Sequence, residues 1–368
     1  MFPPEQITLM LSLTNKNLRA KSKSEITKGE LLKFFGLMIL ITRTAVRDRR
    51  KLWDEQGEWE YLPVHAFNKT GMKSWRFEEI WRWLRWSDCP KDPDGTNASS
   101  AHRWKQVDDF VANFNKYRAN NFNPSDLLCV DESMSKWYGL GGHWINMGLP
   151  MYIAIDRKPV QGCEIQNLAC SRSQVMLRLK LVKSREDKEE FEITREDASG
   201  VLHGTKVMME LLDPWKGGDH ERTVCADSYF ASVGCLNELD FMGINFIGVI
   251  KTATKMFCQK FLNEYVLPTR GDSRTLVSLK PDGNLCAHAT VWVDQSRRFF
   301  IWNAEDFVSD KPTYQVRWRQ PHSEMDDQDD LPERMEFEVQ MPKMVESYYD
   351  ACGAIDKHNK QRQENLEI

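Results

Sequence analysis

The stretch Arg222–Ile250 reads RTVCADSYFASVGCLNELDFMGINFIGVI, and the fold can be deduced by working outward from it. Arg222–Ala226 has the pattern of a short strand that ends at Asp227, Phe230–Phe241 has a helical pattern, and Ile244–Ile250 is almost continuously apolar. Strands that are buried on both faces have such unbroken apolar runs, and a helix between two of them favours parallel pairing. The stretch therefore predicts a strand–helix–strand unit with a crossover helix.

Upstream of this unit, several short strand patterns in succession predict an antiparallel meander. The strand patterns lie at Asp126–Val130, Met151–Ile155, Gly162–Cys170 and Val175–Lys183, and a helical pattern follows at Gly204–Leu212. Together with Arg222–Ile250 they predict a mixed sheet of about five strands with helices on its faces.

The two ends of the chain differ from this central part. Thr27 and Glu30 form a capping-box pattern ahead of an apolar run to Ile41, and Ser74–Trp86 and Val107–Tyr117 are also helical in pattern. We expect a helical domain over 1–125, the first part of a core over 126–253, a β-rich insertion over 254–340, and completion of the core over 341–368.

Composition limits the class of protein. The chain has 368 residues, of which 41% are hydrophobic and 28% charged, which is typical of a globular protein of two to three compact units. It lacks an apolar run of about 18 residues and a secretory signal, so we expect no membrane span. Nine cysteines without a Cys-x-x-Cys pair indicate reduced thiols in an intracellular protein.

Charge is unevenly distributed, although the net formal charge is only −4. Met1–Arg50 carries ten Lys and Arg against four acids, whereas Glu324–Glu338 carries eight acids against one Arg. This asymmetry predicts a basic surface in the first region and an acidic connector in the second, although both regions are also compatible with ordinary solvated surface.

Three acids occupy comparable places in the predicted elements. Asp131 directly follows the first strand pattern, Asp227 directly follows Arg222–Ala226, and Asp356 lies in a late helical pattern over Pro342–Asn365. If these strands pair side by side and the late helix packs across them, the carboxylates meet at one edge of the sheet. Such a group could hold two Mg²⁺ or Mn²⁺ ions about 4 Å apart for phosphodiester cleavage or strand transfer. Acids at strand and helix ends are also common turn formers, so the pattern alone leaves both interpretations open.

Five segments, in this order, resemble the piggyBac family of DDE transposases and their domesticated derivatives. They are RFEEIWRWLRWSD (Arg76–Asp88), VDESMSKWYGLGG (Val130–Gly142), LPMYIAIDRKPVQGCEI (Leu149–Ile165), CADSYFAS (Cys225–Ser232) and GAIDKHNKQ (Gly353–Gln361). The resemblance extends over about residues 1–365.

The resemblance implies a mixed α+β and α/β fold. An RNase H-like catalytic core with a mixed five-stranded sheet would carry a β-rich insertion and follow a helical N-terminal domain for dimerisation and DNA binding. Asp131, Asp227 and Asp356 would be the catalytic and metal-binding residues. The implied activity is Mg²⁺-dependent cleavage and transfer of double-stranded DNA at TTAA sites, by a nuclear protein that acts on transposon ends and target DNA as a homodimer.

Three departures from the family pattern bear on this expectation. The family's additional Asp, three residues after the third catalytic acid, is Asn359 here, which offers an amide oxygen to a metal but adds no charge. Gly141-Gly142-His143 stands where the family has Gly-Arg. No cysteine follows Cys352, so we expect no zinc module in this chain.

Five residues are candidates for DNA contacts: Arg82, Arg85, Trp137, Lys158 and Lys251. Cationic side chains bind phosphates and an aromatic ring stacks on an unpaired base, but core packing and surface solvation explain the same residues. Because the sequence has no P-loop and no dinucleotide-binding glycine motif, we expect no nucleotide cofactor.

The sequence therefore favours a piggyBac-like transposase domain with a three-Asp, two-metal site. A truncated or domesticated transposase-derived protein that binds DNA or partners without catalysis is the main alternative. An unrelated RNase H-like nuclease that acts on RNA or hybrid duplexes is a third.

Overall fold

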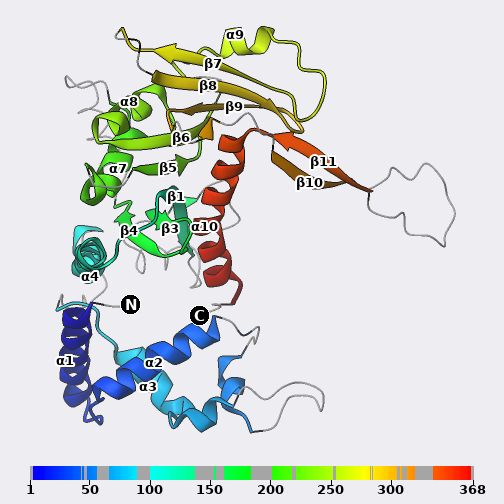
Figure 1. Cartoon of the computed structure of the whole chain (residues 1–368). Helices are drawn as coiled ribbons and strands as arrows, with labels where there is room; N and C mark the ends of the chain where they lie inside the picture. The colour runs from blue at the N-terminus through cyan, green and yellow to red at the C-terminus, as the bar shows by residue number, and fades with distance from the viewer. Residues whose placement is uncertain are drawn as a thin grey trace, which may run out of the picture.

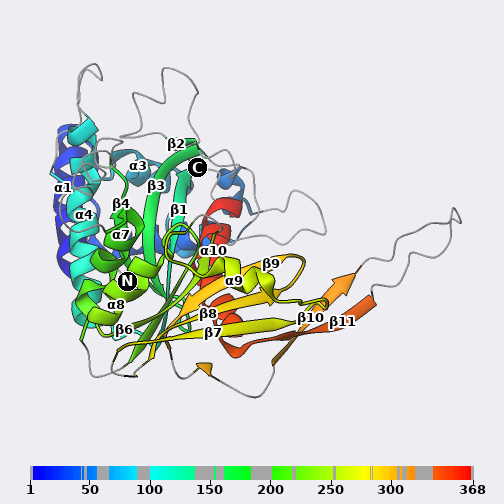
Figure 2. The ribbon, with the colours of Figure 1, turned by 90° about the horizontal axis from the view of Figure 1, so that it is seen from above.

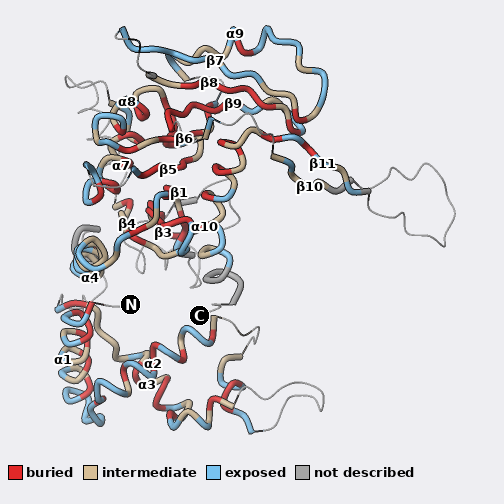
Figure 3. The backbone as a smooth tube through the Cα atoms, viewed as in Figure 1, coloured by how far each residue is buried: buried red, intermediate tan, exposed pale blue. Residues whose placement is uncertain are grey.

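The computed structural model describes residues 3–42, 44, 48–55, 66–88, 100–136, 153–154, 161–183, 201–217, 221–251, 254–281, 283, 285–304, 307–308, 313–319 and 335–365. Within these ranges the chain forms a unit of helices and a larger unit built on a sheet (Figure 1). Each unit has its own buried apolar core, which Figure 3 shows as separate runs of buried backbone.

The helical unit packs three helices around aromatic and aliphatic side chains. Its elements are α1 (Pro4–Ala20), α2 (Lys28–Ile41), η1 (Arg49–Trp53), η2 (Phe67–Thr70) and α3 (Ser74–Trp83). The predicted capping box is confirmed, since the Glu30 amide donates to Thr27 Oγ1 at 3.1 Å and the Thr27 amide donates to Glu30 Oε2 at 3.0 Å. Phe34, Phe77 and Ile80 are almost completely buried between α2 and α3.

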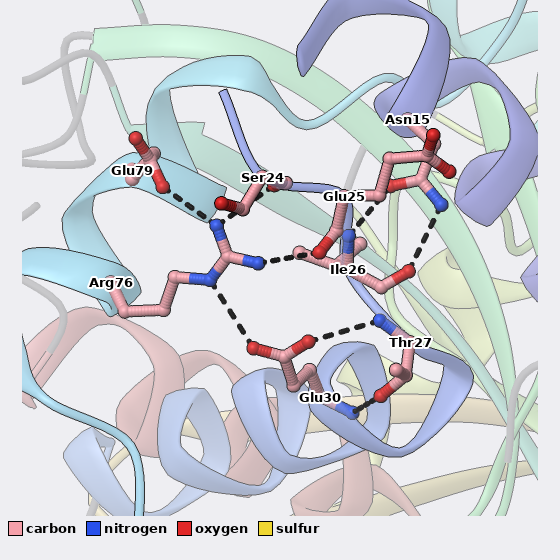
Figure 4. Close-up of polar contacts among 8 residues, drawn as sticks. All are labelled: Asn15, Ser24, Glu25, Ile26, Thr27, Glu30, Arg76 and Glu79. Atoms are coloured by element: carbon pink, nitrogen blue, oxygen red, sulfur yellow. Dashed lines mark hydrogen bonds and ion pairs between the residues drawn. The ribbon is translucent and has the colours of Figure 1, made fainter. Parts of the chain in front are cut away.

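Arg76, in the first turn of α3, links several segments of this unit. Its guanidinium bonds Glu79 at 2.7 Å and Glu30 at 3.2 Å, and donates to the carbonyl oxygens of Ser24 and Glu25 at 3.0 and 2.7 Å (Figure 4). Only 8% of the residue is exposed. The first residue of the RFEEIWRWLRWSD segment is therefore part of the internal structure of the helical unit.

The second unit is a nine-stranded sheet in the order β2-β3-β1-β5-β6-β9-β8-β7, with β4 paired to β3. Its strands are β1 (Leu127–Lys136), β2 (Ile153–Ala154), β3 (Gln161–Cys170), β4 (Met176–Leu181), β5 (Arg222–Ala226), β6 (Ile244–Ile250), β7 (Ser273–Leu279), β8 (Leu285–Val293) and β9 (Arg297–Trp302). β1, β5 and β6 run parallel, whereas β3 and β4 form the antiparallel meander. The predicted mixed core is confirmed.

The insertion contributes three of the nine strands, β7, β8 and β9, and the other six form the core for which about five were expected. β9 pairs antiparallel with β6, with Ile247 opposite Trp302, and β8 and β7 continue outward from β9. The insertion therefore extends the core sheet along the free edge of β6, because an unpaired strand edge is satisfied by further strands. β10 (Thr313–Arg319) and β11 (Met335–Met341) form a separate antiparallel hairpin.

Helices cover the sheet on both faces (Figure 2). α4 (Ser100–Asn121), α7 (His203–Leu212), η3 (Asp213–Trp215) and α8 (Val233–Phe241) lie on one side, α10 (Lys343–Asn365) crosses the other, and the short α9 (Gln259–Glu264) lies by the insertion. Alternate residues of β1 divide between these layers: Leu128 and Val130 join the core under α7 and α8, whereas Leu127 and Cys129 face α10.

Two expectations from composition can be compared with the described part of the chain. No helix there is both long and apolar enough to cross a membrane. The cysteines described are all free thiols, and most of them are buried.

Candidate active site

Two of the three predicted acids come just beyond the parallel pairing of neighbouring strands. The register of β1 and β5 places Val130 opposite Ala226, so that Asp131 and Asp227 come next along the two strands. β5 ends at Ala226 as predicted, but β1 does not end before Asp131, because it continues to Lys136 beside β3. The two acids therefore lie close together, although only Asp227 follows the end of its strand.

A third carboxylate joins this pair, but it is not the one expected. Asp131, Glu132 and Asp227 each offer a carboxylate oxygen, and these oxygens all lie within 4.8 Å of one another. All three residues are half-buried. We refer to Asp131, Glu132 and Asp227 as the acid cluster.

Crowding and burial change the acidity of Asp131. Burial raises the pKa of its carboxyl group to about 8, with further contributions from the hydrogen bond and charge of Glu132 and from the charge of Asp227. The Glu132 amide donates to Asp131 Oδ1 at 2.8 Å and opposes this effect only in part. Without a cation, Asp131 therefore keeps its proton at neutral pH, as expected where like charges are forced together.

A tight turn holds Asp227 in place after β5. The amides of Phe230 and Ala231 donate to the Asp227 carbonyl oxygen at 3.2 and 3.0 Å, and the Tyr229 amide donates to Asp227 Oδ1 at 2.8 Å. Ser232 then caps α8 by accepting from the Cys235 amide at 3.0 Å. The sequence DSYFAS thus forms a turn and a helix cap, which fixes the carboxylate at the sheet edge.

The third predicted acid lies on the helix that packs across these strands. Ala354 and Ile355 of α10 are buried against Cys129 of β1, as the sequence led us to expect for the late helix. Asp356 itself is exposed, and it is not a member of the acid cluster. Asn359, one turn further along α10, is half-buried.

Comparison with known proteins identifies the family. A family model for DDE transposases, described as "Transposase IS4", matches residues 1–366. The chain belongs to this family of DDE transposases.

One solved structure has a fold similar to that of this chain. The cryo-EM structure of a piggyBac transposase synaptic complex with hairpin DNA matches with a TM-score of 0.65 and 16% sequence identity. The alignment covers 99% of the present chain, which spans 66% of the length of that one. No curated protein matches the sequence. The family model therefore confirms the predicted DDE transposase family, and the structural match shows that the chain shares the fold of a piggyBac transposase.

The acid cluster of this transposase suits a hard divalent cation. Its donors are carboxylate oxygens, which Mg²⁺ and Mn²⁺ prefer, and the cluster contains no thiol or imidazole. The raised pKa of Asp131 fits the same interpretation, because the charge of a bound cation would offset the burial and the neighbouring negative charges that keep the proton on this residue.

The predicted DNA-contact residues are spread over the molecule. Arg82 is exposed on α3 and Arg85 is half-buried just beyond it, both in the helical unit. Lys251 is exposed directly after β6, in the sheet unit. Trp137 and Lys158 lie outside the described residues.

Glu132 is the member of the acid cluster that the sequence analysis missed. In a regular strand, neighbouring side chains point to opposite faces, so a residue next to Asp131 is expected to point away from it. β1 nevertheless continues as a strand here, with Glu132 opposite Gln166 of β3, and the carboxylate oxygens of the two neighbouring acids still lie within 4.8 Å of each other. The available sequence signal was the adjacent pair of acids in VDES, at the end of a predicted strand.

Proposed function

We propose that this chain is the catalytic part of a piggyBac-like transposase that cleaves and transfers DNA strands with Mg²⁺ or Mn²⁺. One observation carries the proposal: Asp131 and Asp227 come directly after the parallel pairing of β1 with β5, and their carboxylate oxygens lie within 4.8 Å of each other and of Glu132. A family of DDE transposases and a cluster of hard oxygen ligands both favour phosphoryl transfer.

In this proposal Asp131 and Asp227 hold the cation, and Asp356 approaches from α10 as the third catalytic acid. The bound metal would activate the attacking oxygen and stabilise the leaving one. The chain's own contribution is positional. The β1–β5 pairing sets the spacing of the two aspartates, the turn after Asp227 fixes one of them, and Ile355 anchors the helix that carries Asp356.

The substrate would be double-stranded DNA, at transposon ends and at TTAA target sites. The related solved structure holds hairpin DNA, and exposed cations here can contact phosphates, namely Arg82 and Lys251 together with the half-buried Arg85. Trp137 and Lys158 remain candidate DNA contacts on sequence grounds. Nuclear location and homodimerisation are parts of the same proposal, and they rest on the resemblance to piggyBac-type transposases.

A second candidate function is DNA or partner binding without cleavage. The exposed position of Asp356 outside the acid cluster and the amide at Asn359 favour it. In this case the two remaining aspartates would bind a cation weakly, and DNA would be held without being cut.

A nicking assay on a TTAA-containing duplex with Mg²⁺ or Mn²⁺ separates the two functions. The first predicts that Asp131→Asn, Asp227→Asn and Asp356→Asn each abolish nicking. Asp350→Asn should retain it, because Asp350 is exposed on α10 near the opposite end of the sheet, beside Asp126. DNA binding without nicking by the unmodified chain would support the second function, and nicking that survives Asp227→Asn would refute the first.

A further inference from the structure

An exposed aromatic side chain stands two residues beyond the acid cluster. Tyr229 is 46% exposed, whereas the next residue, Phe230, is 1% exposed and lies in the core under α7 and α8. Isolated exposed aromatic residues are common on protein surfaces, so exposure alone implies nothing. The contacts that hold Tyr229 beside the acid cluster carry the argument instead.

The backbone of Tyr229 is fixed to the catalytic acid itself. Its amide donates to Asp227 Oδ1 at 2.8 Å, and the two residues that follow both donate to the Asp227 carbonyl oxygen. The start of the Tyr229 side chain therefore cannot move without moving the carboxylate. Tyr229 would therefore keep a fixed position relative to any phosphate that the acids and their metal would hold.

Helix α7 fixes the same peptide from the other side. A Cβ atom at Gly204 would lie 2.8 Å from the Tyr229 carbonyl oxygen and 3.1 Å from Phe230 Cα, so only glycine permits this approach. Thr205 Oγ1 lies 3.4 Å from Ser232 Oγ at the start of α8, which is a second contact between α7 and the turn. Two helices thus restrain the segment that presents Tyr229.

The ring has a defined orientation as well. It meets Phe230 edge to face, with ring centroids 4.9 Å apart and planes at 86°. Because Phe230 is buried and immobile, this contact supports the Tyr229 ring, while nearly half of the residue faces solvent.

From this geometry we propose that Tyr229 is a DNA-binding residue of the active site, on which an unpaired base next to the scissile phosphate stacks. The inference rests on the proposed function, whose cleavage site it extends. A phosphate is the less suitable partner for Tyr229, because the neighbouring carboxylates repel anions that are not bridged by a cation. An aromatic face accepts any base without sequence readout, and a preorganised ring loses little freedom on binding.

The test is a DNA-binding titration with a fluorescent base. A TTAA-containing duplex carries 2-aminopurine as an unpaired base next to the cleavage position, and Ca²⁺ replaces Mg²⁺ so that binding is observed apart from cleavage. We expect the unmodified chain and Tyr229→Phe to quench the probe. Tyr229→Ala should lose the quenching and bind about tenfold more weakly, which is typical of removing one stacked base. Tyr314→Ala is the matched control, since Tyr314 is 58% exposed on β10, away from the acid cluster.

Two further measurements distinguish base stacking by Tyr229 from a purely structural role. The circular dichroism spectrum and Mn²⁺ affinity of Tyr229→Ala should equal those of the unmodified chain, because a purely structural role would change them. Quenching by Tyr229→Ala equal to that of the unmodified chain, or no quenching by the unmodified chain, would overturn the stacking proposal. Quenching by a chain that never nicks DNA with Mg²⁺ would instead refute the cleavage function and leave the stacking of Tyr229 in place.

Discussion

At the scale of single residues, the raised pKa of the Asp131 carboxyl group makes stability depend on pH. Its pKa of about 8 lies above the ordinary value of 3.8, so without metal the folded chain binds more protons than the unfolded chain between those values. The metal-free stability should therefore fall as pH rises from about 4 to about 8 and become level above that range. Asp131→Asn should remove this slope, and denaturant unfolding in a chelator across the range would measure it.

The same residue predicts that cation binding releases protons. Near pH 7, binding of Mn²⁺ should release up to about one proton per chain, because Asp131 must ionise to serve as a ligand. Calorimetric titrations in buffers of different ionisation enthalpy would count the protons. Equal apparent enthalpies in all buffers would show that Asp131 is already ionised.

Asn359 offers a gain-of-charge experiment on α10. It is half-buried on the same helix as Asp356, where the piggyBac-type pattern has an acid. If this part of α10 contributes to the metal site, Asn359→Asp should raise Mn²⁺ affinity by roughly tenfold, the usual size of effect for a group near a metal. Lys357→Asp is the control, because it adds the same acid on an exposed part of the helix. Equal affinities for both variants would place Asn359 outside the metal site.

Sequence reasoning at this scale placed Asp131 and Asp227 together but did not include Glu132. The two aspartates were predicted because each follows an apolar run, and the parallel pairing of these runs stops just before both. Glu132 was missed because strand alternation assigns it to the opposite face. The exposure of Asp356 depends on how far α10 rotates on the sheet, which the local pattern does not determine.

At the scale of elements, the contact between α7 and the turn after Asp227 depends on Gly204. A methyl group there meets backbone atoms of Tyr229 and Phe230, which cannot rotate away as a side chain could. Gly204→Ala should therefore lower the free energy of unfolding by about 1–3 kcal/mol and weaken Mn²⁺ binding by displacing Asp227.

Gly36→Ala in α2 is the control for that prediction. No atom lies within 4 Å of a Cβ at Gly36, so the substitution should stabilise the chain by about 0.5–1 kcal/mol through helix propensity alone. Urea unfolding of both variants gives the comparison. Equal effects of the two substitutions would mean that α7 does not hold the turn.

Element types were largely predictable, and their exact limits were not. The helical pattern at Phe230–Phe241 becomes a helix only at Val233, because the Asp227 carbonyl oxygen draws the amides of Phe230 and Ala231 into a turn. The pairing of β9 with β6 joins segments far apart in sequence, and periodicity within either strand contains no information about it.

At the scale of the whole molecule, a substitution that destabilises one unit should leave the other unit folded. Arg76 is 8% exposed and bonds two carboxylates and two carbonyl oxygens, all within the helical unit. Arg76→Ala should destabilise that unit by about 3–5 kcal/mol, because it leaves Glu30 without its cation, Glu79 with Lys23 alone, and two carbonyl oxygens without their donor. The sheet unit, whose core is distinct, should keep its Mn²⁺ affinity.

Limited proteolysis combined with a Mn²⁺ titration would check this independence. Arg19→Ala is the control, since the Arg19–Glu25 pair is exposed and should contribute less than about 1 kcal/mol. Loss of Mn²⁺ binding in Arg76→Ala would show that the helical unit supports the acid cluster directly.

The packing of α10 on β1 also determines when the proposed active site can form during synthesis of the chain. Asp131 and Asp227 emerge from the ribosome first, and more than a hundred residues, among them the insertion and the hairpin, follow before the helix that carries Asp356. Contacts between such distant segments form late, and domains commonly fold as their chain becomes available. Under the proposed function, a nascent chain would therefore lack a complete active site until the helix that carries Asp356 has been synthesised.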